Sequence, residues 1–168
     1  MPLPQSYHVH RSIGLIRTPY TRQAPYQPPA AEAGDFKIVL EPRFAEGLYM
    51  LDTFKYMYVL YALDRIYVQP ASLRLRPPWM PDREVGVFAS RSPRRPNPIG
   101  LSVVEILEIA GNVIRISPID AFDGTPVLDI KPYLNLLDAK PDANYGWAGD
   151  QGDSEHLALH IKGIPHKH

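Results

Sequence analysis

The chain has 168 residues, of which 18 are Lys or Arg and 18 are Asp or Glu, so its formal net charge is zero. This balance argues against a general binder of polyanions, although it leaves room for a local basic patch. The absence of cysteine excludes disulfides, thiolate catalysis and cysteine-type zinc sites. The 19 prolines, roughly twice ordinary usage, leave little room for long helices and favour a β-rich fold.

The first half of the chain predicts short strands separated by proline-containing loops. Alternating apolar residues predict strands over 12–17 and 36–40, and aromatic and β-branched residues predict strand structure within 54–68. Between these, apolar residues at helical spacing predict a short helix over 43–52, with Pro42 in its first turn. We interpret the aromatic residues of 54–68 as core, and the alternative is a base-stacking platform.

The second half of the chain predicts another buried strand and a hairpin. A proline-rich connection over 73–81 leads to a short apolar run that predicts a buried strand over 85–89. Residues 101–109 and 113–117 flank a Gly-Asn turn at 110–112, and this pattern predicts a β-hairpin.

The end of the chain predicts one further strand and an arm. A short strand is expected over 127–130, and the polar residues 138–153, which include Trp147, predict an extended arm. The alternation over 157–161 is typical of a last strand.

Several kinds of protein are excluded or disfavoured by what the sequence lacks. There is no GxGxxG or GxxxxGK[ST] motif, and helices do not alternate with strands, so a Rossmann-type fold is not expected. No apolar run approaches the roughly 20 residues that span a bilayer, and residues 1–30 lack the apolar core of a signal peptide. We therefore expect a cytoplasmic protein with no membrane contact. His156 and His160 have ligand-like spacing, but without nearby cysteines we expect no metal site.

The most distinctive stretch is SRSPRRPNP, residues 90–98, which lies between two predicted strands. Its prolines forbid a helix and bias the preceding residues toward extended geometry. A stiff loop with arginine, serine and asparagine donors suits a small anionic or polar ligand, because little rotamer entropy is lost on binding. The alternative is a disordered linker. Between residues 74 and 95 there are six arginines and only two acids, so basic charge is concentrated beside this loop.

Acidic residues gather around a second loop. Asp120, Asp123 and Asp129 surround the Asp-Gly-Thr-Pro turn at 123–126. Turn aspartates usually cap their own backbone, and the alternative is a site for an amine, a ribose or a sulfonium. The arginine-containing loop offers the complementary donors for a carboxylate. A ligand that uses both loops would carry carboxylate, amine, ribose and adenine, which describes S-adenosylmethionine.

Four stretches of the chain resemble the TsaA-like β-barrel family, whose best-known members are the TrmO-type tRNA methyltransferases. They are IGLIRTPY at 13–20, APYQP at 24–28, GVFASRSPRRPNPIGLS at 86–102 and DGTPVLDIKPYL at 123–134. The resemblance implies a mainly β fold, a small closed or partly open β-barrel with short helices and a C-terminal arm, and not a Rossmann sheet. We expect the barrel domain over 1–135 and the arm over 136–168.

The resemblance also implies a function. Members depend on S-adenosylmethionine, form dimers, and methylate N6 of threonylcarbamoyladenosine beside the anticodon of tRNA. We therefore expect the same cofactor, tRNA as partner and a homodimer. The alternatives are a barrel that binds S-adenosylmethionine without methylating tRNA, as a regulatory or RNA-binding module, and a methyltransferase for another small molecule or RNA.

The matching motifs assign expected roles to individual residues. The expected cofactor contacts are Pro25, Tyr26, Gln27, Asp64, Arg65, Arg91, Leu101, Asp120, Phe122, Asp123 and Gly124. The expected tRNA phosphate contacts are Arg76, Arg83, Arg94 and Arg95. The catalytic base stays open among Asp123, Asp129 and Tyr133.

The chain departs from the family pattern in two places. Tyr26 stands where members carry the arginine of a Pro-Arg-Gln motif. Tyr56 and Asp64 stand where members carry histidines, within and after an FSHLW-like stretch. These departures put the cofactor contacts of this segment, and the identity of the methyl acceptor, in question.

Overall fold

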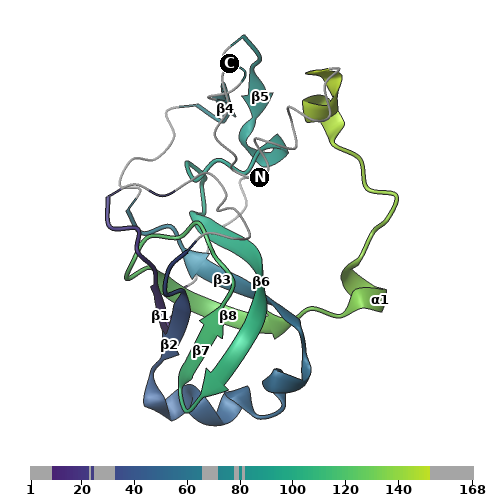
Figure 1. The fold of residues 1–168 in the computed structure, drawn as a ribbon. Coiled ribbons are helices and arrows are strands. Elements are labelled where there is room, and N and C mark those ends of the chain that lie inside the picture. Colours follow the sequence, from purple (N-terminus) through teal and green to yellow (C-terminus); the bar gives the residue numbers. More distant parts are fainter. Residues whose placement is uncertain are drawn as a thin grey trace, which may run out of the picture.

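The main body of the protein is a closed barrel of six antiparallel strands in the order β1-β2-β7-β6-β3-β8 (Figure 1). The computed structural model describes residues 9–22, 24, 33–65, 72–77, 80 and 82–151, without the side chains of the last two. The barrel strands are β1 (Gly14–Arg17), β2 (Lys37–Leu40), β3 (Tyr56–Ala62), β6 (Ile99–Ala110), β7 (Val113–Ile116) and β8 (Pro126–Pro132). The expected non-Rossmann β-barrel is thereby confirmed.

Alternation along the strands fills the barrel interior. Ile16, Ile38, Val59 and Ile114 are fully buried, and their sequence neighbours on each strand are less buried. This follows from the period of two, which directs every second side chain inward. Each fully buried aliphatic side chain contributes roughly 1.5–3 kcal/mol, so these short strands are held by the shared core. The strands predicted over 12–17 and 36–40 are confirmed.

The predicted hairpin is also confirmed. Ala110 pairs with Val113, so only Gly111 and Asn112 form the loop between β6 and β7. Gly111 has a φ of 61°, in the left-handed region that a tight hairpin turn requires. The side-chain amide of Asn112 donates to the carbonyl of Leu40 at 2.6 Å, which ties the turn to the end of β2.

The helix predicted over 43–52 has a different form in the structure. Two 3-10 helices, η1 (Pro42–Leu48) and η2 (Leu51–Thr53), occupy this stretch. Met50 separates them with a φ of 68°, which an α-helix does not allow. So short a segment has few internal hydrogen bonds, and packing of Leu48 and Leu51 into the core decides its geometry instead.

The strand predicted over 85–89 is wrong beyond its first two residues. Only β5 (Val85–Gly86) is extended, and it pairs with β4 (Arg74–Leu75) in a small separate sheet. Residues Val87–Ala89 form the 3-10 helix η3. The Val87 N–H still donates to the carbonyl of Leu73, beside β4, at 2.8 Å, but the Val87 carbonyl accepts from the Ser90 hydroxyl at 3.0 Å, so the strand pairing ends at this residue.

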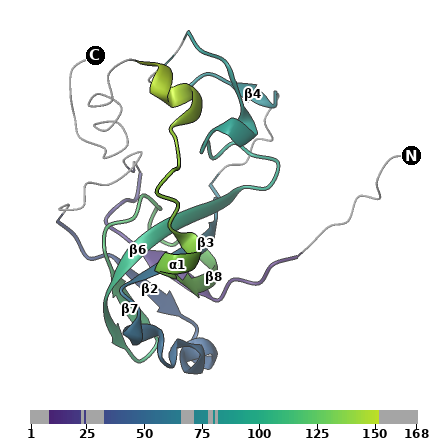
Figure 2. The ribbon, with the colours of Figure 1, turned by 90° about the vertical axis from the view of Figure 1, so that its right-hand side faces the viewer.

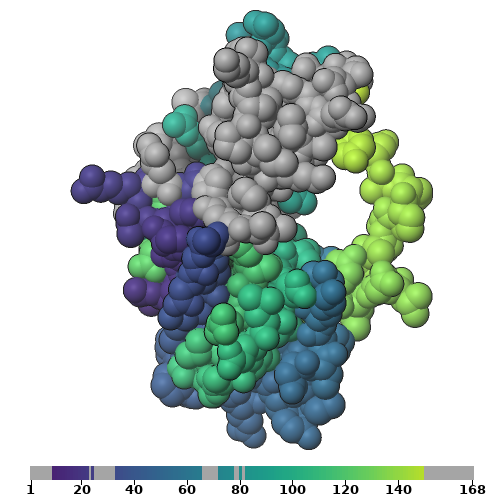
Figure 3. Space-filling view, in the orientation of Figure 1, coloured from purple at the N-terminus to yellow at the C-terminus, as the bar shows by residue number. Residues whose placement is uncertain are grey.

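The chain after β8 forms an arm that returns to η3. Figures 1 and 2 show it running from α1 (Asn135–Asp138) to the 3-10 helix η4 (Gly146–Gln151). The indole N–H of Trp147 donates to the carbonyl of Ala89 at 2.7 Å, which anchors the far end of the arm. Between these ends the arm stands away from the barrel (Figure 3). A domain boundary at residue 135 stays a prediction, and the strand expected over 157–161 lies outside the described residues.

Within the part of the chain that the structure describes, no helix has the length and apolar character that crossing a membrane requires.

The packing of Tyr61 on Gly100 gives a test of the barrel. The two residues are paired across β3 and β6, and a Cβ on Gly100 would lie 2.2 Å from Cε2 of the Tyr61 ring. Because that ring is buried, we predict that Gly100→Ala lowers the free energy of unfolding by about 1–3 kcal/mol, measured by urea denaturation. Gly47→Ala is the control, since a Cβ there meets no atom within 4 Å. Equal unfolding midpoints for Gly100→Ala and wild type would contradict this packing.

Candidate functional site

Two loops meet at the end of the barrel where β1 finishes. We call residues 90–98 the arginine loop and residues 118–125 the aspartate turn. The arginine loop connects η3 to β6, and the aspartate turn connects β7 to β8. The inward-facing residues at the ends of β3 and β6 lie between them.

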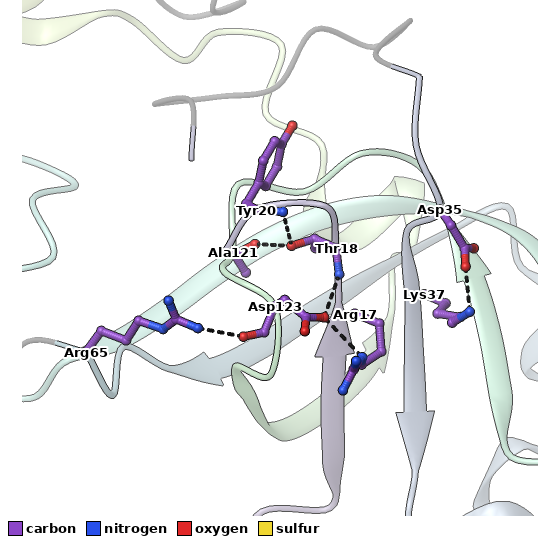
Figure 4. Close-up of polar contacts among 8 residues, drawn as sticks. All are labelled: Arg17, Thr18, Tyr20, Asp35, Lys37, Arg65, Ala121 and Asp123. Atoms are coloured by element: carbon purple, nitrogen blue, oxygen red, sulfur yellow. Dashed lines mark hydrogen bonds and ion pairs between the residues drawn. The ribbon is translucent and has the colours of Figure 1, made fainter. Parts of the chain in front are cut away.

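Bonds to β1 fix the aspartate turn (Figure 4). Asp123 Oδ1 lies 3.0 Å from Arg17 Nε and accepts from the backbone N–H of Thr18 at 3.2 Å. The buried Thr18 hydroxyl donates to the carbonyl of Ala121 at 2.9 Å. Gly124 has a φ of 83°, and its N–H donates to the carbonyl of Ile16 at 2.8 Å. The Asp123 carboxylate therefore holds the turn in place.

Arg65, just after β3, also binds the backbone of the aspartate turn. Its guanidinium donates to the carbonyls of Thr21 and Asp123 at 2.7 and 2.8 Å (Figure 4 shows the second bond). It also lies 4.6 Å from the centroid of the Phe122 ring, a cation–π contact. Arg65 therefore joins the chain segments around the turn through its bonds to the two carbonyls and its contact with Phe122.

Asp120 belongs to a partly buried polar cluster inside this end of the barrel. The Tyr61 hydroxyl donates to Asp120 Oδ1 at 3.3 Å and lies 3.1 Å from the Ser102 hydroxyl. Burial raises the pKa of Asp120, and its own backbone N–H, Tyr61, Arg91 and Ser102 partly oppose that rise. Burial, and next the charge of Asp120, raises the pKa of Tyr61, so its hydroxyl stays protonated and keeps donating.

The charge of Arg91, in the arginine loop, acts on the side chains of this cluster. Its positive charge lowers the pKa of both Asp120 and Tyr61, against the stronger effect of burial. Arg91 itself is exposed. The charge of Arg91 thus acts on an acid of the aspartate turn, and the expected binding of one ligand by both loops stays a prediction.

Arg95 points back into its own loop. Its Nη1 donates to the carbonyl of Ser90 at 2.8 Å and, at longer range, to those of Val87 and Ser92. These bonds use one nitrogen of the guanidinium, and the expected phosphate contact of Arg95 stays a prediction. Arg94 is exposed.

Arg76 and Arg83, the other expected phosphate contacts, lie in the segment that carries β4 and leads to β5. Arg76 is exposed and Arg83 is half-buried, and each takes part in an interaction within the chain.

Other expected site residues lie apart from the cluster. Asp129 pairs with Lys131 at 2.7 Å and lines an apolar cavity of about 360 Å³ beneath η1 and η2, at the opposite end of the barrel. The Tyr133 ring lies 5.5 Å from that of Tyr58. Leu101 is exposed on the outer face of β6, whereas its neighbour Ser102 faces inward. Neither Asp129 nor Tyr133 is brought to the aspartate turn.

The remaining expected cofactor contacts are Asp64, Pro25, Tyr26 and Gln27. Asp64 is exposed beside Arg65. Pro25, Tyr26 and Gln27 lie outside the described residues, as do His156 and His160. Among the residues that the structure does describe, no three His, Asp or Glu side chains are grouped as a metal site would require.

Sequence reasoning missed Tyr61, Ser102, Arg17 and Thr18 as parts of this site. One signal was present for Ser102, because it is a polar residue at an inward position between Gly100 and Val104 of a predicted strand. Arg17 and Thr18 lie in the stretch IGLIRTPY that resembles the family, but the sequence did not indicate their bonds to the aspartate turn, because these depend on the pairing of β1 with β8.

Fold and site together define a small closed β-barrel protein with an arginine–aspartate cluster at one end. The family model described as “tRNA-methyltransferase O N-terminal domain” matches residues 15–139. The chain belongs to this TrmO family.

Relatives and solved structures agree with that assignment. A “Probable S-adenosyl-L-methionine-binding protein” of Archaeoglobus fulgidus is 43% identical over 157 residues, which cover 90% of this chain and 42% of that protein. The “tRNA (adenine(37)-N6)-methyltransferase” of Escherichia coli is 34% identical over 145 residues, or 81% of this chain and 62% of the enzyme. The “Crystal structure of TrmO” matches with a TM-score of 0.70 and 35% identity, over 84% of this chain and 64% of that one. The chain therefore spans less than two thirds of the length of each of these three proteins.

The anchor of the arm beside the arginine loop can be tested through Trp147. Trp147→Phe removes the indole donor to Ala89, a hydrogen bond worth about 0.5–1.5 kcal/mol. We predict faster amide hydrogen exchange over residues 139–149 with little change in Tm, because the arm adds nothing to the barrel core. Tyr145→Phe, on the exposed side chain of Tyr145 in the same arm, is the control. Unchanged exchange in Trp147→Phe would show that the bond does not hold the arm.

Proposed function

We propose that this protein transfers a methyl group from S-adenosylmethionine to N6 of an adenosine in tRNA, and that the acceptor is threonylcarbamoyladenosine beside the anticodon. The observation that carries the proposal is the partly buried cluster of Asp120, Tyr61 and Ser102 at one end of the barrel, on which the positive charge of Arg91 acts. The names of the relatives support both the cofactor and the reaction. Activity and substrate are proposals for this chain, because it spans only part of the Escherichia coli enzyme.

The residues of the cluster fit S-adenosylmethionine by charge. When bound, this cofactor supplies a methyl group on a positively charged sulfur, next to an amino acid carboxylate. The Arg91 guanidinium offers charge-assisted hydrogen bonds to such a carboxylate. Asp120 offers a negative charge at a partly buried position, where screening by water is weak. The two side chains thus match groups of opposite sign on one ligand.

The role of the chain in methyl transfer is mainly to position the reactants. An in-line displacement is accelerated when donor and acceptor are held in the geometry of attack. The ties of Asp123 to β1 and of Arg65 to the aspartate turn keep this end of the barrel rigid. A rigid site loses little entropy on binding.

Exposed arginine in the arginine loop supports a tRNA contact. Arg94 is exposed in the same loop as Arg91, so a bound phosphate there would lie close to the proposed cofactor site. In the neighbouring sheet, Arg74 lies 3.6 Å from Glu84, an exposed pair that water screens. We place the nucleic acid on this side of the molecule.

We also propose a homodimer, with the outer face of β6 as its contact surface. This face carries a row of exposed apolar side chains, namely Ile99, Leu101, Val103 and Leu107. Leu136 and Leu137 of α1, which follows β8, are also exposed. Contiguous apolar surface of this kind marks a protein contact, and the arm that stands away from the barrel leaves room for a second copy (Figure 3).

One observation also favours a second function, the binding of S-adenosylmethionine without methylation of tRNA. Arg65, which follows the position of a missing family histidine, is occupied with backbone carbonyls. A barrel that binds S-adenosylmethionine without methylating tRNA is consistent with this.

Incorporation of labelled methyl from S-adenosylmethionine into total tRNA separates the two functions. Incorporation, followed by nuclease digestion and mass spectrometry that finds the methyl on threonylcarbamoyladenosine, is the expected result. Cofactor binding by calorimetry without incorporation would instead favour the binding protein.

Arg91 and Arg94 are predicted to have separate roles. Arg91→Ala should weaken S-adenosylmethionine binding by about 1.5–3 kcal/mol in calorimetry, because a charge-assisted hydrogen bond is lost. Arg94→Ala should leave that affinity intact, weaken tRNA binding and reduce its logarithmic salt dependence by about one phosphate contact. The reverse pattern, with cofactor affinity lost only in Arg94→Ala, would refute the assignment.

The dimer is predicted to dissociate when its apolar face is charged. Sedimentation of the wild type at micromolar concentration should show a dimer, and Val103→Glu should sediment as a monomer because a buried unpaired carboxylate disfavours the contact. Leu15→Glu is the matched control, since Leu15 is exposed on β1, across the barrel from β6. A monomeric wild type would refute the homodimer.

A further inference from the structure

Among the acids of the site, Asp120 is the one whose surroundings suit a proton acceptor. The carboxylate of Asp123 is bound to Arg17 and to the backbone of Thr18. Asp129 pairs with Lys131 at the opposite end of the barrel. Asp120 instead lies partly buried, and among the residues that the structure describes its carboxylate accepts from the Tyr61 hydroxyl and forms no ion pair.

We propose that Asp120 is the catalytic base of methyl transfer, and that Tyr61 and Ser102 are positioning residues that hold its carboxylate. The proposal rests on the proposed function and deepens it by naming the group that takes the proton from the acceptor nitrogen.

The reaction needs such a group. The exocyclic nitrogen of adenine shares its lone pair with the ring, so it attacks carbon weakly while it keeps its proton. As the nitrogen lone pair forms the new N–C bond, the carbon–sulfur bond breaks and its electron pair stays on sulfur. As the new bond forms, the N6 proton passes to a carboxylate oxygen of Asp120, which leaves the product neutral at nitrogen. A positioned base of this kind contributes roughly 10²–10⁴-fold to a rate.

The surroundings of Asp120 favour this role. A general base acts best when its pKa lies near the working pH, and burial raises the pKa of Asp120 in that direction. The groups that face it are Tyr61 from β3, Ser102 from β6 and Arg91 from the arginine loop, and all three lower its pKa against burial. They keep the carboxylate ionised and ready to accept a proton.

The position of the carboxylate is set by packing as well as by hydrogen bonds. Tyr61 is buried, and its ring lies against Gly100, where a Cβ would collide with it. A side chain held in this way has one rotamer, so its hydroxyl presents a fixed donor to Asp120 Oδ1.

Single-turnover methylation of tRNA by Asp120→Asn tests the base. The amide keeps the size of the side chain but is a far weaker proton acceptor, so we expect the rate constant to fall by about 10²–10⁴-fold, a larger factor than the loss of affinity for S-adenosylmethionine that follows from removing the negative charge. Asp52→Asn, at an exposed position on η2, is the control and should keep the wild-type rate. A wild-type rate in Asp120→Asn would overturn the proposal. Equal losses of rate and cofactor affinity would make Asp120 a binding residue instead.

Titration of the carboxyl group supplies a readout without any ligand. Carbon-13 NMR of the protein alone should show Asp120 titrating above the ordinary aspartate range. The Tyr61 hydroxyl stabilises the ionised form, so Tyr61→Phe should raise that pKa further and shift the acidic limb of the pH–rate profile to higher pH. A wild-type carboxyl that titrates in the ordinary range, or a limb that Tyr61→Phe leaves in place, would overturn the positioning role.

The same assays separate this proposal from the proposed function. A wild type that transfers no methyl group to tRNA would refute both. A wild type that methylates tRNA, together with an equally active Asp120→Asn, would refute only the role of Asp120.

Discussion

The attachment of the aspartate turn to β1 is the constraint on which the site depends. Asp123 binds Arg17 and the backbone of Thr18, and the Thr18 hydroxyl binds the carbonyl of Ala121. These contacts join residues more than 100 positions apart, so they form only after the barrel has closed. With the turn held at both Ala121 and Asp123, Asp120 has little freedom except to point toward Tyr61 and Ser102. Asp123 thus stabilises the turn, and the carboxylate of Asp120 stays available for the reaction.

Barrel closure explains why such short strands carry a defined site. β1, β2 and β7 have four residues each, and none of them would be stable as an isolated strand. In the closed barrel each strand pairs on both sides, and the shared core of Ile16, Ile38 and Ile114 fixes their register. The inward positions near one end hold polar residues instead, and the core residue Tyr61 supplies a hydroxyl there. The barrel is therefore a packed core that ends in a polar cluster.

The sequence alone predicted those features that depend on local patterns. The alternation in β1 and β2 and the turn at Gly111 and Asn112 were visible because a strand period and a tight turn each need only neighbouring residues. The motifs around Arg91 and Asp120 located the two loops. The 3-10 helices were not predictable, since they follow from how Leu48 and Val87 pack. The sequence also did not predict the bonds of Arg95 within its own loop or the roles of Tyr61 and Ser102. Each of these depends on partners that only the folded chain brings near.

Binding of the cofactor between the arginine loop and the aspartate turn can be tested by a crystal structure of the protein with S-adenosylhomocysteine. We expect the amino acid carboxylate of this ligand on the Arg91 guanidinium, with its sulfur on the side of Asp120. Density for the ligand at the opposite end of the barrel, in the apolar cavity beside Leu48 and Asp129, would show that the cofactor binds elsewhere.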